Sequence, residues 1–133
     1  MRARGACERG SLSIFFAVMG VGLLMAAGLA IDGGRKLNAL GAARDLADNA
    51  ARAGAQEVDR SRARETGEVV LDATAAEARA LGYLASVGRT GSVVVSADTV
   101  TVTVAIDQEM VILPVGTQRV SATESARTLQ EAP

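Results

Sequence analysis

The run LSIFFAVMGVGLLMAAGLAI, from Leu12 to Ile31, decides the fold, because Ser13 carries its only polar side chain. Its twenty residues would rise about 30 Å as an α-helix, which is the thickness of the hydrocarbon core of a bilayer. A buried helix in a soluble protein of this size would show a polar stripe, and this run shows none. We therefore predict a transmembrane helix over residues 12–31.

The competing interpretation of the same run is a secretory signal that is cleaved. The apolar stretch of such a signal is about 7–15 residues long, and this one is longer, although Gly28-Leu29-Ala30 resembles a weak cleavage site. Cleavage there would release a soluble protein that begins at Ile31. The length of the run favours a permanent anchor.

Basic residues flank the run on both sides, so the positive-inside rule separates the two orientations only weakly. They are Arg2, Arg4 and Arg9 before the run and Arg35, Lys36 and Arg44 after it. The amino terminus adds one more positive charge on the short side, so we expect residues 1–11 to form a cytosolic tail. The chain would then cross the cell membrane once and place its C-terminal part outside the cytoplasm.

Small residues recur every four positions along the predicted helix, at Gly22, Ala26, Ala30 and Gly34. Such a row allows the backbones of two membrane helices to approach closely. It is a candidate helix-packing surface, although a segment so rich in Ala and Gly also produces such rows by chance.

Helical periodicity continues through residues 32–58, in spite of Gly33 and Gly34, and predicts a helical stalk that ends at about Val58. Its inward positions are Leu37, Leu40, Ala43, Ala47, Ala50 or Ala51, Gly54 and Val58. This narrow stripe of mostly small residues suits close packing against another helix or a sheet. Arg44 and Asp48 would pair on the opposite face. Asp32 and Arg35 could also pair, but ordinary interfacial polarity with a snorkelling Arg is the favoured interpretation.

Residues 59–133 are predicted to form a small extracytoplasmic α+β domain that begins with a loop and a helix. The segment Asp59–Gly67 is dense in charge and ends in Gly, which is typical of a loop. A second helix is predicted over about Glu68–Ser86. Its inward residues would be Val69, Ala73, Ala76, Ala80, Leu81 and Leu84.

After Gly91 the apolar period changes to two, which is typical of half-buried strands. Residues 92–96 and 100–106 would form a hairpin around the turn Ala97-Asp98. Residues 110–113 are a third apolar run, and residues 117–129 form a further candidate strand, with a short helix as the weaker alternative. Val120, Ala122 and Ser125 would face inward there. The predicted fold class is α+β: an N-terminal transmembrane helix that continues into an extended helix, a second helix, and a small antiparallel sheet of three or four strands.

The composition argues against catalysis. The chain has no His and one Cys, Cys7, which excludes Ser-His and Cys-His couples, an intramolecular disulfide and Cys-cluster metal sites. A net charge of −1 argues against bulk nucleic-acid binding. Two pairs of neighbouring carboxylates, Asp45 with Asp48 and Glu65 with Glu68, lie beside Arg residues and are interpreted as surface charges. We expect no enzyme activity, cofactor, metal, nucleic acid or small-molecule substrate.

Three stretches resemble the N-terminal region of TadE/TadG-like proteins of the Flp-type tight-adherence pilus system. They are Arg9-Gly10-Ser11, the end of the span from Gly28 through the motif residues Asp32, Gly34 and Arg35, and residues 42–55. The resemblance covers about the first 58 residues. It implies a single-pass, pseudopilin-like envelope protein that helps to build or anchor a thin pilus or a related secretion apparatus. Its partners would be the lipid bilayer and other pilus-assembly or pilin-like membrane proteins.

The resemblance also implies a possible prepilin-type processing site between Gly10 and Ser11. Such processing typically requires Glu five residues after the Gly, and this position is Phe15. Permanent anchorage is therefore the favoured prediction. The alternative function is an anchored extracytoplasmic binding or sensor domain that is unrelated to pili.

Overall fold

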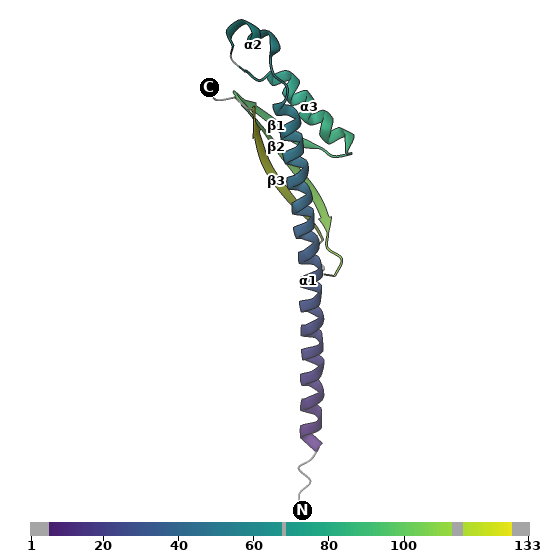
Figure 1. The fold of residues 1–133 in the computed structure, drawn as a ribbon. Helices are drawn as coiled ribbons and strands as arrows, with labels where there is room; N and C mark the ends of the chain where they lie inside the picture. The colour runs from purple at the N-terminus through teal and green to yellow at the C-terminus, as the bar shows by residue number, and fades with distance from the viewer. Residues whose placement is uncertain (1–5, 68, 113–115, 129–133) are drawn as a thin grey trace, which may run out of the picture.

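The computed structural model describes residues 6–67, 69–112 and 116–128 of the 133-residue chain. These residues form one long helix that carries a small head of two further helices and a three-stranded sheet (Figure 1). The head lies against the C-terminal half of the long helix, while the N-terminal half extends away from it. The α+β class, and a strand count within the range of three or four, are confirmed.

The long helix α1 runs without interruption over Ala6–Ala55, a length of 50 residues or about 75 Å. It includes residues 6–11, so the described part of the predicted tail is helical in its backbone. The helix also passes through Gly33 and Gly34, at a cost of about 1 kcal/mol each relative to Ala.

Helix α1 ends three residues before the predicted end at Val58 because the chain turns there into a short backbone bridge with Leu71. Two hydrogen bonds flank the bridge: the Asp59 amide donates to the Val70 carbonyl at 2.8 Å, and the Asp72 amide donates to the Glu57 carbonyl at 3.0 Å.

The segment predicted as a charged loop contains a short helix, α2 (Arg60–Thr66), so that prediction is wrong. Asp59 is its N-cap, with a carboxylate that accepts hydrogen bonds from the Ser61 and Arg62 amides, and Gly67 ends it at φ 74°. This capping supplies the partners that the first turn lacks, and it outweighs the repulsion between the Arg side chains.

The next helix, α3 (Ala73–Ser86), begins later than predicted because Asp72 caps it. Glu68, the predicted start, lies outside the described residues. Three of the predicted inward residues, Ala76, Ala80 and Leu84, are buried. The other three, Val69, Ala73 and Leu81, are exposed, which corrects the prediction.

The sheet has the order β1-β2-β3 and is antiparallel throughout. Its strands are β1 (Gly91–Ser96), β2 (Thr99–Glu109) and β3 (Thr117–Arg127). The two-residue turn Ala97-Asp98 joins β1 to β2 as predicted, with Ala97 at φ 49°. Of the predicted third apolar run, residues 110–112 lie outside the strands and Leu113 lies outside the described residues.

The core is a seam between the small residues of α1 and one face of the sheet. Ala43, Ala47, Ala50 and Ala51 are fully buried in one cluster with residues of α3 and with the sheet residues Val100, Val102, Val104, Ile106, Val120 and Ala122. Side chains this small let the helix axis lie close to the strands, as the stripe predicted. At Gly54 an added Cβ would come within 2.8 Å of the Ala76 carbonyl oxygen of α3, so only Gly allows this helix contact.

Two inward assignments are wrong. Leu37 is 69% exposed, and Ala39 lies in the core instead. Alternate residues of β3 face the core, and these are the even-numbered ones: Val120 and Ala122 are buried, and Glu124 and Ala126 are half-buried. Ser125 has an odd number, so it lies on the opposite face of the strand and is exposed.

Candidate functional site

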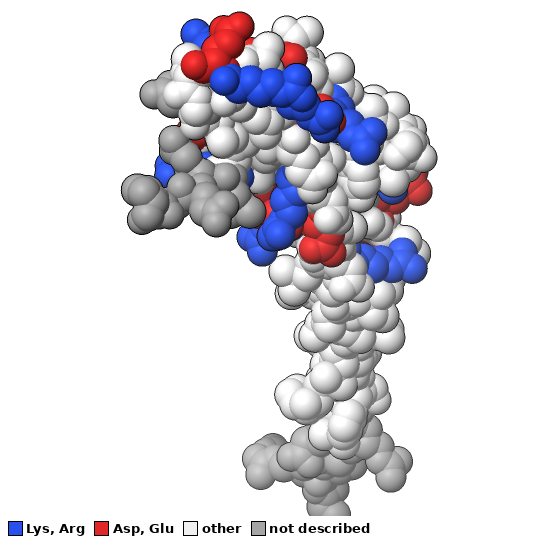
Figure 2. Space-filling model, turned by 45° about the horizontal axis from the view of Figure 1, so that its top comes forward, with Lys and Arg blue, Asp and Glu red and all other residues white. Residues whose placement is uncertain are grey.

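Residues 12–31 of α1 form an apolar surface that nothing in the described chain covers, except at Gly28. Its large side chains are between 50% and 73% exposed, with Ile31 and Leu24 at the two limits. Figure 2 shows the same division: charged side chains gather on the head, and the shaft below it is white down to the grey residues. This helix is long and apolar enough to cross a membrane.

The predicted helix-packing row lies on an open face of α1. Gly22, Ala26, Ala30 and Gly34 are all exposed, and an added Cβ at Gly22 or Gly34 would meet nothing within 4 Å. The row is thus available to another helix, but no described segment of this chain contacts it at either glycine.

The motif residue Asp32 is 1% exposed and joins α1 to the end of the sheet nearest the apolar run. Its carboxylate accepts hydrogen bonds from the backbone amides of Val111 and Ile112, at 3.2 and 3.1 Å. These two residues follow β2 in the connection to β3. The favoured prediction of an ordinary interfacial polar residue is therefore wrong for Asp32, whereas Arg35 is exposed as that prediction expects.

One helical turn before Asp32, Gly28 makes room for the same connection. Gly28 is the buried residue within the apolar run, and an added Cβ would lie 2.6 Å from Cγ2 of Ile112. No side chain fits at this distance without a shift of its neighbour. Gly28 and Asp32 together position Ile112 against α1. We use the name Asp32 junction for the packing of Ile112 on Gly28 and the hydrogen bonds from the Val111 and Ile112 amides to Asp32.

The position of Asp32 along the helix is a sequence signal for the Asp32 junction. At about 100° per residue, positions 28, 32, 39 and 43 fall on one face of a helix. Ala39 and Ala43 of this face are buried against the sheet. A polar residue on a core-facing stripe implies a partner, and the partner of Asp32 lies 79 and 80 residues further along the chain.

The charged groups of the head make ordinary surface pairs. Asp48 pairs with Arg52 at 2.9 Å rather than with the predicted Arg44. The Arg119 guanidinium beside Asp107 lowers the pKa of that carboxyl through a hydrogen bond of 2.8 Å, and the pKa of Arg119 is raised in turn. The pKa of Asp59 is lowered chiefly by the hydrogen bond from the Ser61 hydroxyl.

Of the two pairs of neighbouring carboxylates, the first has an exposed Asp45 and an Asp48 that forms an ion pair with Arg52. The second pair includes Glu68, which lies outside the described residues. Within the part of the chain that the structure describes, no group of three or more His, Cys, Asp or Glu side chains gathers to hold a metal ion.

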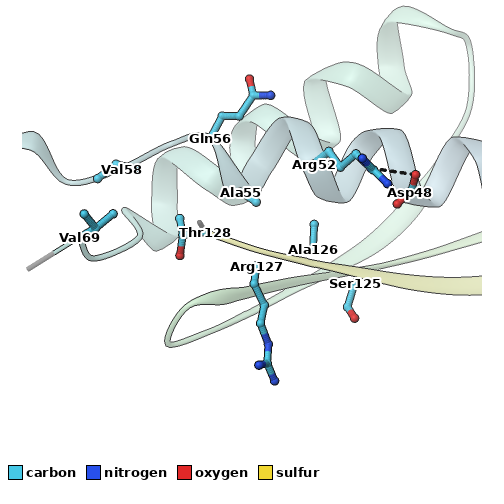
Figure 3. A pocket seen from close by; sticks show the side chains of 10 residues that line it. All are labelled: Asp48, Arg52, Ala55, Gln56, Val58, Val69, Ser125, Ala126, Arg127 and Thr128. Atoms are coloured by element: carbon cyan, nitrogen blue, oxygen red, sulfur yellow. Dashed lines mark hydrogen bonds and ion pairs between the residues drawn. The ribbon is translucent and has the colours of Figure 1, made fainter. Parts of the chain in front are cut away.

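An open groove of about 550 Å³ lies at the end of the head farthest from the apolar half of α1. The groove is lined by the end of α1, the end of β3, Val58 and Val69 (Figure 3). Its ion pair, Asp48 with Arg52, lies on one side, and the Arg127 side chain extends away from α1. The described lining offers shallow apolar contact.

The family described as "Putative Flp pilus-assembly TadE/G-like" matches residues 10–57 of this chain. The matched segment covers nearly all of α1, including Asp32 and Gly28. It supports the interpretation of the chain as a protein related to Flp pilus assembly. Neither the search of curated proteins nor the search of solved structures returned a match.

Proposed function

We propose that this chain is a non-catalytic, membrane-anchored, pseudopilin-like component of a Flp/Tad-type pilus assembly or a related secretion apparatus. The observation that carries the proposal is the division of α1 into a bare apolar half and a half that packs on the sheet. Such a helix suits a subunit that is held in the bilayer at one end and presents its head to partners at the other. The family match over residues 10–57 supports the link to pilus assembly.

In this proposal residues 12–31 cross the cell membrane, the N-terminus is cytoplasmic, and residues 59–133 form the extracytoplasmic head. The open row at Gly22, Ala26, Ala30 and Gly34 would contact the membrane helix of another assembly protein. Close helix contact of this kind stabilises membrane complexes where the hydrophobic effect between helices is absent.

The proposal is tested by crosslinking in native membranes, followed by purification of the full chain and identification of its partners. Recovery of a pilus ATPase, a polytopic platform protein or a filament subunit is expected. The matched variants are Gly22→Leu, which obstructs the row, and Leu24→Ala, which leaves it open. Loss of the partner in the first variant alone would identify the row as the contact.

The second candidate is an anchored binding or sensor domain, and the groove beside Arg127 is the feature that favours it. Consistent absence of pilus-assembly proteins from the crosslinked material would favour this candidate. The intact mass of the native protein would show whether the chain is uncut or is cleaved after Gly10 or Ala30.

A further inference from the structure

We infer that Val111 and Ile112, which lie in the described part of the β2–β3 connection and are called the tip below, enter the lipid at the boundary of the bilayer on the head side. The inference rests on the proposed membrane anchorage and adds a second, peripheral lipid contact made by the head itself. The partner is the boundary between lipid headgroups and acyl chains.

The depth of the tip follows from its contacts with α1. Ile112 touches Gly28, which lies three residues inside the apolar run that ends at Ile31. Gly28 is four residues, or about 6 Å along the helix axis, below Asp32. The exposed Arg35 and Lys36 mark the aqueous side of the same boundary. The tip is therefore at the level of the last turn of the span and not above it.

The side chains at the tip suit this level. Val111 is 65% exposed and Ile112 is 47% exposed, and they lie beside the apolar surface of α1. Large apolar side chains exposed next to a membrane-spanning segment gain free energy when lipid covers them.

The backbone at the tip is adapted to the same environment. A free amide at membrane depth costs several kcal/mol, so irregular backbone needs internal partners there. Asp32 supplies them, because its buried carboxylate accepts from both the Val111 and the Ile112 amides. The Asp32 junction thus allows a non-helical segment to lie where water is scarce.

The chain contains no Trp, so single Trp residues report position by fluorescence. Three variants are compared: Val111→Trp at the tip, Val94→Trp on the sheet, and Leu24→Trp in the span. Their native side chains are 65%, 62% and 73% exposed, so none of the changes replaces a core residue. Each full-length variant is placed in phosphatidylcholine vesicles at high lipid excess, with and without lipids brominated near the headgroup.

We expect Val111→Trp to emit at shorter wavelength than Val94→Trp, to lose emission in the brominated lipid, and to resist quenching by aqueous iodide. Val94→Trp serves as the matched exposed valine and should show the opposite behaviour. If Val111→Trp behaves like Val94→Trp while Leu24→Trp is quenched by lipid, the inference fails and the membrane anchor stands.

Two other outcomes also overturn the inference. If Val111→Trp is shielded from iodide but unaffected by brominated lipid, a second copy of the chain covers the tip instead. If Leu24→Trp is itself open to iodide, the proposed anchor fails, and the lipid contact of the tip fails with it.

Discussion

At the scale of single residues, Asp32 is the connection between the helix and the end of the sheet nearest the span. Its carboxylate holds two amides of one loop, and removal of the carboxylate would leave both without this acceptor. Loss of such partners at a buried site costs about 1–3 kcal/mol. Asp32 therefore couples the position of the loop to the position of the helix.

We expect Asp32→Ala to speed hydrogen exchange at the Val111 and Ile112 amides by about 5- to 150-fold, the equivalent of that cost. The measurement is amide exchange by NMR on the full chain in detergent micelles. Asp45→Ala is the control, because Asp45 is an exposed carboxylate on the same helix. Equal exchange rates in the two variants would contradict the role given to Asp32.

Gly28 contributes to the same contact by having no side chain. We expect Gly28→Val to displace Ile112, because the new Cβ would lie 2.6 Å from Cγ2 of that residue. The displacement would appear as loss of the nuclear Overhauser contacts between the Ile112 methyl groups and α1. The control is Gly22→Val, whose new side chain meets nothing within 4 Å and should leave those contacts intact. If the contacts also survive in Gly28→Val, Ile112 does not pack against Gly28 as described.

The cross-strand pair of Asp107 and Arg119 gives the head a response to acid. Arg119 lowers the pKa of Asp107 below its ordinary value of 3.8. The stabilisation from the charged carboxylate is therefore present above that value and is lost as the pH falls through the lowered pKa.

We expect the carboxyl carbon of Asp107 to titrate by NMR below its ordinary range, and to return to that range in Arg119→Gln. Arg127→Gln on the same strand is the control, since Asp107 is paired in register with residue 119. If the pKa of Asp107 is the same with and without Arg119, the ion pair does not lower it.

At the scale of elements, the seam between α1 and the sheet depends on small side chains. Ala47 is fully buried, whereas Ala42 on the same helix is exposed. We expect Ala47→Leu to lower the free energy of unfolding of the head by about 1–3 kcal/mol or more, because a close-packed seam has no room for added methyl groups.

The matched control for the seam is Ala42→Leu, which adds the same atoms to the solvent side. Denaturant titration of both variants in micelles, followed by far-ultraviolet circular dichroism, measures the difference. A loss of stability that is equal in the two variants would mean that helix α1 does not depend on close contact with the sheet.

Elements were predictable where one local pattern dominates. The apolar run, the continuous helix and the Ala97-Asp98 hairpin follow from spacings that are visible within a few residues. Helix α2 was missed because the charge density of its seven residues favoured a loop, while the decisive signal was a single capping residue, Asp59. Leu37 was misplaced because the stripe turns gradually around the helix, and the choice between Leu37 and Ala39 depends on where the sheet lies.

At the scale of the whole molecule, helical periodicity can place Asp32 on the core-facing side of α1, but the partner of Asp32 was beyond local patterns. Val111 follows Asp32 by 79 residues in the sequence. To predict their contact, one must know how long β2 is and where that strand crosses α1. The family resemblance marked Asp32 as a motif residue but did not indicate its partner. Long-range hydrogen bonds of this kind follow from the assembled fold and not from periodicity.

In the proposed function, residues 12–31 of α1 cross a membrane and the helix carries the head outside the cytoplasm. The most direct test of this anchor is extraction of native membranes with alkaline carbonate, followed by flotation and detection of the full-length chain. We expect the chain to stay with the floating membranes. Release of the intact, full-length chain into the soluble fraction would contradict the proposed membrane anchor.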